Sequence, residues 1–178
     1  MLALDEIWWL VSPQNPLKPV HGMAPFAVRV ASARRVAAHP RIKVTDLETR
    51  LGTRFTIHTL TALRHRFPAT RFVWLMGADN LRQISHWESW TRIFALVPIA
   101  VFARPAYSLR ALGGLAAHRF ARNRIGPAEA RHLAEMKPPA WVFFATRLDP
   151  LSATAIRERR RRAVFARHVA LRGRAARS

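Results

Sequence analysis

The sequence predicts an α/β fold with a mainly parallel sheet, and three observations support this class. Short apolar runs alternate with helical patterns along the chain. The apolar residues within each run are nearly continuous, which is typical of strands covered on both faces. Of the 178 residues, 50% are hydrophobic, which is enough to bury one sizeable core. We therefore expect one domain, with helices on both faces of its sheet.

Strands are expected at the apolar runs, which in chain order are residues 6–11, 41–45, 71–76, 98–103 and 141–145. Helical patterns lie between them, at residues 25–39, 56–67, 86–96, 108–122 and 127–136. Pro25 suits the first turn of its helix, where a missing N–H costs no hydrogen bond. Thr56 is expected to cap the next helix through its hydroxyl. The chain has no internal repeat and no low-complexity linker.

The composition excludes several classes of protein. With zero cysteines, the chain has no disulfide framework, no thiolate nucleophile and no cysteine-based metal site. No stretch approaches the roughly 18 uninterrupted apolar residues that span a bilayer. Residues 1–6 lack the basic segment of a signal peptide. We therefore expect a cytoplasmic protein that has no membrane partner.

The formal net charge of +20 comes from 30 lysine and arginine residues against 10 acidic ones. The arginines are spread along the chain, which disfavours a dedicated nucleic-acid stripe, yet a basic surface attracts nucleotides. They are densest near the tail, residues 161–178, which follows a main domain expected at residues 1–160. A basic helix there could contact RNA, DNA or an acidic membrane surface. We favour the simpler interpretation, a solvated C-terminal helix.

Polar residues follow the predicted strands at the end where open parallel sheets bind their ligands. Residues 12–19 follow the first strand, Gly77 and Asp79 follow the third, and Arg104 follows the fourth. Each has a purely structural explanation: prolines make rigid connectors, Gly77 permits a tight turn and Asp79 caps a helix. Because these groups share one rim of one sheet, a common binding site explains them better.

The segment after the last strand, residues 152–157, places two hydroxyls and a guanidinium at a predicted helix start. Pro150 ends the preceding loop, and Ser152 is the expected N-cap. The free N–H groups of the first turn, the helix dipole and Arg157 would converge on one anion. On this motif alone an ordinary capped helix is the better explanation, but beside the other rim residues it predicts a phosphate site.

Taken in order, these motifs resemble those of bacterial nicotinate-nucleotide adenylyltransferase. They are Trp8-Trp9-Leu10-Val11-Ser12-Pro13-Gln14-Asn15-Pro16-Leu17-Lys18, Phe55-Thr56-x-x-Thr59-Leu60, Gly77-Ala78-Asp79-Asn80 followed by His86-Trp87, Arg104-Pro105, and Ser152-x-Thr154-x-x-Arg157. The resemblance extends over nearly the whole chain. It implies a Rossmann-like nucleotidyltransferase fold and a role in NAD biosynthesis. The implied reaction joins ATP and nicotinate mononucleotide to give deamido-NAD and pyrophosphate, and it requires Mg²⁺.

The resemblance also implies how ATP would be held. Ser152, Thr154 and Arg157 would bind its phosphates, with Arg157 stabilising charge during catalysis. Asp79 would accept hydrogen bonds from ribose hydroxyls, and Gly77 would allow close approach to the backbone. In the family the 5′-phosphate of the mononucleotide attacks the α-phosphorus directly, so no covalent nucleophile is needed. Phosphates supply most ligands of magnesium, and no protein ligand is expected.

For the second substrate, the resemblance implies that Trp87 stacks on the pyridine ring. Backbone N–H groups around Thr56 and near Trp87 would bind the nicotinate carboxylate. Asn15, Lys18 and Arg104 are further polar candidates around the mononucleotide. The alternative for Trp87 is that it simply packs in the core, which is also what we expect of Trp90.

The largest departure from the family is the absence of its Gly-Gly-x-Phe-x-Pro-x-His-x-Gly-His motif from these 178 residues. In the family this motif ends a central first strand, and its histidines stabilise charge in the transition state. Without that strand, its neighbours would have unpaired edges inside the core. We hypothesise that the sequence starts at an internal methionine and that the natural protein is longer. If the chain does start at Met1, we expect negligible adenylyl transfer.

Two other functions stay open. A related nucleotidyltransferase that acts on phosphopantetheine or NMN shares the fold and the final motif, but residues 8–18 and the Gly77 to Trp87 spacing disfavour it. A catalytically inactive basic fragment, with the tail as its binding element, is the third candidate. Weak and strongly salt-dependent RNA binding would favour that candidate. The sequence implies no particular oligomeric state.

Overall fold

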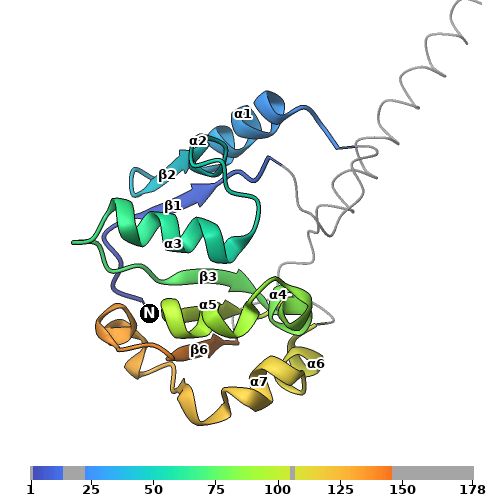
Figure 1. Ribbon diagram of the computed structural model, residues 1–178, viewed down its shortest axis with the longest axis vertical. Helices are drawn as coiled ribbons and strands as arrows, with labels where there is room; N and C mark the ends of the chain where they lie inside the picture. Colours follow the sequence, from blue (N-terminus) through green and yellow to red (C-terminus); the bar gives the residue numbers. More distant parts are fainter. Residues whose placement is uncertain (1, 14–22, 105–106, 146–178) are drawn as a thin grey trace, which may run out of the picture. The chain divides into compact units, whose positions relative to one another are not determined.

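Two separate parallel sheets, not one continuous sheet, form the framework of the protein (Figure 1). The computed structural model describes residues 2–13, 23–104 and 107–145, which lie within one compact unit, Met1–Thr146. The predicted boundary at residue 160 lies outside these residues. The smaller sheet pairs β1 (Ile7–Leu10) with β2 (Ile42–Thr45). The larger has the order β3 (Trp74–Gly77), β4 (Ile99–Phe102), β6 (Trp141–Phe144) and β5 (Arg124–Ile125).

The larger sheet carries the main core. β4 pairs with β3 on one side and β6 on the other, all in parallel. The side chains of Ile99, Ala100 and Val101 are 0% exposed, because helices and loops cover both faces of this strand. Its uninterrupted apolar run is thus the signature of a doubly covered parallel strand, as predicted.

Helices connect the strands and cover the sheets. The first helix, α1 (Phe26–Val36), packs Val30 and Ala33 against the smaller sheet. The others, in chain order, are α2 (Leu47–Arg50), α3 (Thr56–Arg66), α4 (Ala78–Gln83), α5 (Trp90–Leu96), α6 (Ser108–Leu112) and α7 (Leu115–Arg119), with 3₁₀ turns η1 (Ile84–His86), η2 (Ala121–Asn123) and η3 (Glu129–Glu135). Ile57 and Leu60 of α3 belong to the main core cluster.

The predicted strands are confirmed to within one residue at each end, except that the third begins at Trp74, three residues late. The short β5 and α2 were not predicted, because a paired segment of two residues and a single helical turn carry almost no periodic signal.

Several helical predictions need correction. Pro25 stands at the N-cap position, before α1, and not in the first turn. The helix predicted at 86–96 begins only at Trp90, since Ser89 adopts a left-handed conformation with φ 48°. The segment 108–122 is broken at Gly113 and Gly114, where glycine disfavours a continuous helix. The segment 127–136 forms the 3₁₀ turn η3 and no α-helix.

Candidate functional site

Gly77, Asp79 and Arg104 meet at the carboxyl ends of β3 and β4. Gly77 is the last residue of β3, Asp79 lies in the first turn of α4, and Arg104 follows β4 by two residues. Because β3 and β4 are parallel and in register from Trp74 to Gly77, their ends lie at one edge. Arg104 Nε lies 3.3 Å from Asp79 Oδ1, an ion pair between two predicted site residues.

Gly77 is required for space and not for backbone conformation. Its φ of −81° is one that any residue adopts, so the tight-turn explanation is wrong. A Cβ at this position would overlap Asp79 Oδ1 and would lie 2.6 Å from Arg104 Nε. Only glycine therefore leaves room for the Asp79–Arg104 ion pair against the backbone of this turn. Gly77 is itself the N-cap residue of α4, so Asp79 does not cap that helix.

The Asp79 carboxylate is partly sheltered, with 29% of its side chain exposed against 58% for Arg104. Its Oδ1 atom is shielded from solvent and has no hydrogen-bond partner among the described residues, although Arg104 lies within ion-pair distance. A carboxylate oxygen accepts more than one hydrogen bond. The turn thus presents an acceptor, held in place by a guanidinium, beside the half-buried Gly77.

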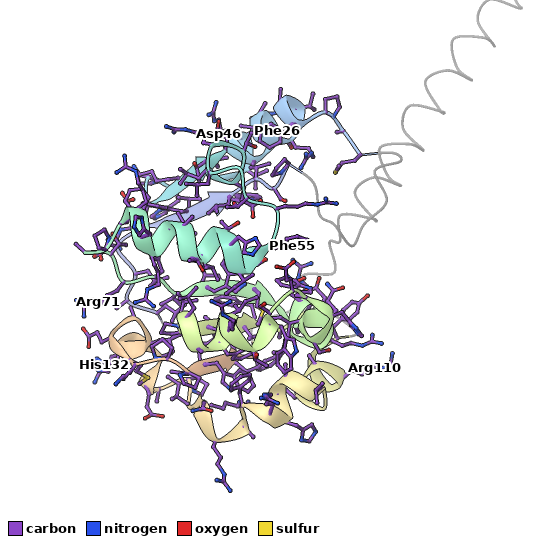
Figure 2. The ribbon with its side chains drawn as sticks, viewed as in Figure 1. Phe26, Asp46, Phe55, Arg71, Arg110 and His132 are labelled. Carbon is purple, nitrogen blue, oxygen red and sulfur yellow. The ribbon has the colours of Figure 1, made fainter. Side chains whose placement is uncertain are left out.

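The start of α3 is a second polar region. Figure 2 labels Phe55, the residue that precedes α3. It lies at the end of α3 toward which the β1 and β3 arrows point in Figure 1. Phe55 is the N-cap residue, and no side chain of the described residues caps the helix, so the predicted Thr56 cap is wrong. Thr56 is instead the first helical residue. Its half-buried backbone lies where a helix has N–H groups without intrahelical partners.

A buried hydroxyl network supports this helix start. The Thr59 side chain is 0% exposed, and its Oγ1 lies 2.8 Å from Thr53 Oγ1 and 3.4 Å from Glu48 Oε1. Burial raises the pKa of the Glu48 carboxyl, while hydrogen bonds from Ser12 and Thr59 act in the opposite direction. Glu48 therefore joins the loop after β1 to α3. Sequence reasoning missed it, because a glutamate in a single helical turn looks like any surface carboxylate.

Arg29 holds the loop that follows β1. From α1 it donates hydrogen bonds to the backbone carbonyls of Ser12, Pro13 (2.7 Å) and Ala24 (3.1 Å). These carbonyls stand on both sides of residues 14–22, so one guanidinium ties together the two described ends of that segment. Among so many arginines, no sequence signal distinguished this one.

Trp87 lies on the loop between η1 and α5. Its side chain is half-buried and packs against the main core. Its Nε1 atom is shielded from solvent and has no hydrogen-bond partner in the part of the chain that the structure describes. His58 Nε2 of α3 lies 3.2 Å from Glu88 Oε1, a contact that ties this loop to the start of α3 when the imidazole is protonated. The two predicted nicotinate-binding segments, around Thr56 and Trp87, are thus joined through neighbouring residues.

Trp90 packs into the core, as expected. Its ring makes edge contacts with Phe94, at 6.3 Å between centroids, and with Phe120, at 6.0 Å. Of the other predicted site residues, the loop pair Asn15 and Lys18 and the phosphate-binding set Ser152, Thr154 and Arg157 lie outside the described residues. Over residues 2–13, 23–104 and 107–145, no group of three or more His, Asp or Glu side chains could hold a metal ion. In the same ranges no helix is long and apolar enough to cross a bilayer.

Comparison with known proteins identifies the family. A cytidylyltransferase-like family model matches residues 1–159. A protein of Cereibacter sphaeroides named "Probable nicotinate-nucleotide adenylyltransferase" is 54% identical over 154 residues, which cover 86% of this chain and 81% of that protein. The chain belongs to the nicotinate-nucleotide adenylyltransferase family. Relatives of the same name in Gluconobacter oxydans (54% identity, 88% and 80% of the two chains) and in a Bradyrhizobium strain (49%, 88% and 81%) agree.

A solved structure of Plasmodium falciparum nicotinic acid mononucleotide adenylyltransferase complexed with APC is also similar, at 14% identity and a TM-score of 0.47. The similarity covers 85% of this chain and 63% of that one. As a nicotinate-nucleotide adenylyltransferase family member, the chain has the predicted Rossmann-like nucleotidyltransferase fold.

Proposed function

We propose that this protein transfers the adenylyl group of ATP to nicotinate mononucleotide, giving deamido-NAD and pyrophosphate in NAD biosynthesis. The observation that carries the proposal is the 54% identity to a nicotinate-nucleotide adenylyltransferase over 86% of the chain. Of the proposed site residues, Gly77, Asp79 and Arg104 lie at the carboxyl ends of β3 and β4, which supports a shared site there. The cytoplasmic location stays a prediction from the sequence.

The Gly77 turn is proposed to bind the ribose of ATP. The sheltered Asp79 Oδ1 would accept a ribose hydroxyl, which supplies the hydrogen bond that this atom lacks. Arg104 would hold the carboxylate in place and face the mononucleotide phosphate. The absent Cβ of Gly77 leaves room for the Asp79–Arg104 ion pair to pack against the turn.

The nicotinate moiety is proposed to lie between the start of α3 and the Trp87 loop. N–H groups around Thr56 would bind its carboxylate, and the indole of Trp87 would stack on the electron-poor ring. This pairing would distinguish nicotinate from nicotinamide, because an amide carries no charge for the helix start to stabilise. Asn15 and Lys18, in the loop whose ends Arg29 holds, are proposed to contact the mononucleotide.

Catalysis is proposed to rest on positioning and charge stabilisation. The 5′-phosphate oxygen of nicotinate mononucleotide forms a bond to the α-phosphorus of ATP, and the bond from that phosphorus to the bridging oxygen breaks, so pyrophosphate leaves. Ser152, Thr154 and Arg157 would bind the phosphates that carry the developing charge. Bound Mg²⁺ would add further charge neutralisation; as a hard cation it would take phosphate oxygens as ligands.

Binding selectivity tests the proposal. Titration calorimetry of this chain with nicotinate mononucleotide, NMN and phosphopantetheine should give the tightest binding for nicotinate mononucleotide, by at least tenfold. That ratio corresponds to about 1.4 kcal/mol. Preference for either of the other two compounds, or no binding of any pyridine mononucleotide, would contradict the proposal.

The role of Asp79 is tested with a matched pair of variants. Asp79→Asn replaces one carboxylate oxygen by a donor and should weaken ATP binding about tenfold or more, since hydrogen bonds to charged groups contribute about 1.5–3 kcal/mol. Asp5→Asn changes an exposed carboxylate before β1, at the opposite end of the strands, and should leave ATP binding unchanged. Equal ATP affinity for the two variants would exclude Asp79 from the ATP site.

A further inference from the structure

Two polar contacts that the structure describes join α3 to α5 and to the loop before it. Arg64 donates from Nη1 to the Leu96 carbonyl at 3.0 Å, where both helices end. His58 Nε2 lies 3.2 Å from Glu88 Oε1, just before α5 begins. The two helices therefore run side by side in the same direction, with one polar contact near each end.

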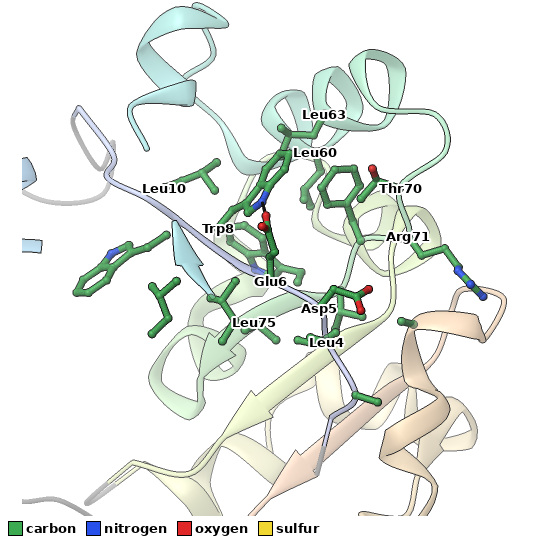
Figure 3. A pocket seen from close by; sticks show the side chains of 18 of the residues that line it. Leu4, Asp5, Glu6, Trp8, Leu10, Leu60, Leu63, Thr70, Arg71 and Leu75 are labelled. Atoms are coloured by element: carbon green, nitrogen blue, oxygen red, sulfur yellow. Dashed lines mark hydrogen bonds between the residues drawn. The ribbon is translucent and has the colours of Figure 1, made fainter. Parts of the chain in front are cut away.

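The opposite face of α3 is anchored in the fold. Leu60 and Leu63 are 2% and 3% exposed and line a cavity of about 910 Å³ between the two sheets, with the Trp8 ring among them (Figure 3). His58 lies on the outer face of the helix, with 56% of its side chain exposed. Because its apolar face holds α3 in place, the contact made by His58 positions the loop and not the helix.

The loop at residues 87–89 has a strained backbone. Ser89 adopts φ 48°, a left-handed conformation that residues with a Cβ rarely adopt. Such conformations persist where the surrounding structure holds them. On one side the Arg92 N–H donates to the Ser89 carbonyl at 2.8 Å, and on the other side Glu88 makes its contact with His58. The ion pair is thus one of the described contacts that keep this loop in its conformation.

The contact bears directly on Trp87, the residue before Glu88. The Trp87 indole packs inward against the main core cluster, whereas Glu88 is exposed and reaches outward to α3. The two side chains share one short stretch of backbone. When Glu88 is held by His58, the point from which the indole projects is fixed as well.

His58 also contacts the residue at which α3 begins. Its imidazole meets the Phe55 ring edge-on, at 5.9 Å between centroids. Phe55 is the N-cap residue, so the free N–H groups of the helix start follow it directly. One imidazole therefore contacts both the helix start and the Trp87 loop, the two segments proposed to bind nicotinate.

The charges around His58 give the contact a pH dependence. His58 lines a groove of about 520 Å³ beside α3, and the other charged groups that line it are all basic: His65, Arg66 and Arg92. Arg54, whose guanidinium lies over the Phe55 ring, is basic too. Glu88 is the carboxylate in contact with the imidazole. Histidine gains its charge as the pH falls through about 8 to 5, so attraction to Glu88 should grow over that range.

We propose that His58 is a positioning residue for nicotinate: through Glu88 it holds the Trp87 loop against the start of α3, more firmly when its imidazole is protonated. Nicotinate mononucleotide should therefore bind more tightly to a chain in which the pair is intact, and the advantage should grow as the pH falls. The inference rests on the proposed function, because it takes the pyridine ring to lie between these two segments.

Amide hydrogen exchange tests the effect on the loop without any ligand. The Trp87 N–H donates to the Ile84 carbonyl at 2.9 Å. Near pH 6 it should exchange about threefold faster in His58→Gln than in the wild type. That ratio corresponds to about 0.7 kcal/mol, which is within the range of an exposed ion pair.

The matched control is His65→Gln, which lies in the same groove and for which the structure describes no ion pair. Its Trp87 amide should exchange as fast as that of the wild type. Equal exchange in His58→Gln and the wild type would overturn the proposal, whether or not the chain binds a nucleotide.

Calorimetry with nicotinate mononucleotide tests the effect on binding. Near pH 6, His58→Gln, Glu88→Gln and the double variant should each bind it about threefold more weakly than the wild type, because removal of either partner removes the whole contact. Near pH 8 the ratio between His58→Gln and the wild type should fall below about 1.5. Titration of the ligand itself is common to both chains and cancels in that ratio. Losses that add in the double variant, or a ratio that is the same at both pH values, would overturn the proposal.

Failure of the proposed function would give a different pattern. If the wild type bound no nicotinate mononucleotide while its Trp87 amide still depended on His58, both the proposed function and the role of His58 toward nicotinate would be rejected. If the wild type and all the variants bound nicotinate mononucleotide equally well, only the role of His58 would be rejected.

Discussion

At the scale of single residues, we expect Gly77 to matter more for ATP binding than for the stability of the fold. In Gly77→Ala the new Cβ overlaps Asp79 Oδ1 and crowds Arg104, whose side chain can swing into solvent. We expect little loss of stability but about tenfold weaker ATP binding, or about 1.4 kcal/mol, because the ion pair is broken and the backbone covered. Calorimetry with ATP and thermal unfolding give the two quantities.

The control for that substitution is Gly126→Ala, where the nearest atom to a Cβ would be Glu129 Oε2 at an ordinary 3.4 Å. It should leave ATP binding unchanged. If Gly77→Ala binds ATP as tightly as this control, the turn does not contact the nucleotide.

Glu48 predicts a specific pH dependence of stability. Since burial raises the pKa of its carboxyl from 4.5, the folded state binds the proton more tightly than the unfolded state. The contribution of Glu48 to stability is therefore greatest below the ordinary pKa and falls as the pH rises through the raised one. Glu48→Gln does not titrate and can still accept hydrogen bonds from Ser12 and Thr59. As the pH rises through that range, the free energy of unfolding of Glu48→Gln, measured with urea, should increase relative to that of the wild type.

The matched substitution for this experiment is Glu129→Gln, on an exposed carboxylate that water solvates. Between Glu129→Gln and the wild type, the difference in free energy of unfolding should change less with pH than it does for Glu48→Gln. If the Glu48→Gln difference were constant with pH, the hydroxyl network would not depend on the charge of Glu48.

At the scale of elements, α1 acts as an anchor for the loop after β1. Arg29→Ala removes donors from the carbonyls of Ser12, Pro13 and Ala24. We expect a loss of about 1–2 kcal/mol in the free energy of unfolding, at the low end for charged hydrogen bonds because Arg29 is only half-buried. Nicotinate mononucleotide should bind more weakly, since Asn15 and Lys18 lie between the anchored ends.

Arg35→Ala, on the exposed end of the same helix, is the control. Surface substitutions of this kind change stability by about 0.5 kcal/mol or less. If Arg29→Ala and Arg35→Ala lowered the free energy of unfolding by similar amounts, the hydrogen bonds from Arg29 to the loop would contribute nothing to stability.

At the scale of the whole molecule, the two sheets should differ in stability. β4 is paired on both sides, and its Ile99, Ala100 and Val101 are 0% exposed. Among the described residues, β1 is paired on one side, and it carries the exposed Ile7 and Trp9. In native-state hydrogen exchange the Val101 amide should open only on global unfolding, and the Trp9 amide at a lower free energy. Identical opening free energies at all guanidinium concentrations would mean that the sheets unfold as one unit.

The sequence by itself determined the class of fold, the family and all the described strands except the short β5. Continuous apolar runs report burial on both faces, and motifs such as Gly77-Ala78-Asp79-Asn80 are local enough to recognise without coordinates. The sequence predicted that Asp79 and Arg104 share one rim of the sheet, but not that their side chains are in contact. The two residues are 25 positions apart in the chain, and only the register between strands brings them together. Thr56 as a cap and residues 86–96 as one helix were wrong, since backbone conformations such as the left-handed Ser89 depend on packing.

Only the tertiary structure decided what supports the site and where the sheet is interrupted. Glu48, Thr59 and Arg29 act through partners that are distant in sequence, and no periodicity marks such contacts. The sequence led us to expect unpaired strand edges, but only the coordinates place them at β1 and β3, around an apolar cavity, with Ile7 and Trp9 uncovered nearby. Local pattern determines which segments become strands. Pairing between strands is a property of the folded chain, because hydrogen bonds across a sheet join residues that the sequence keeps apart.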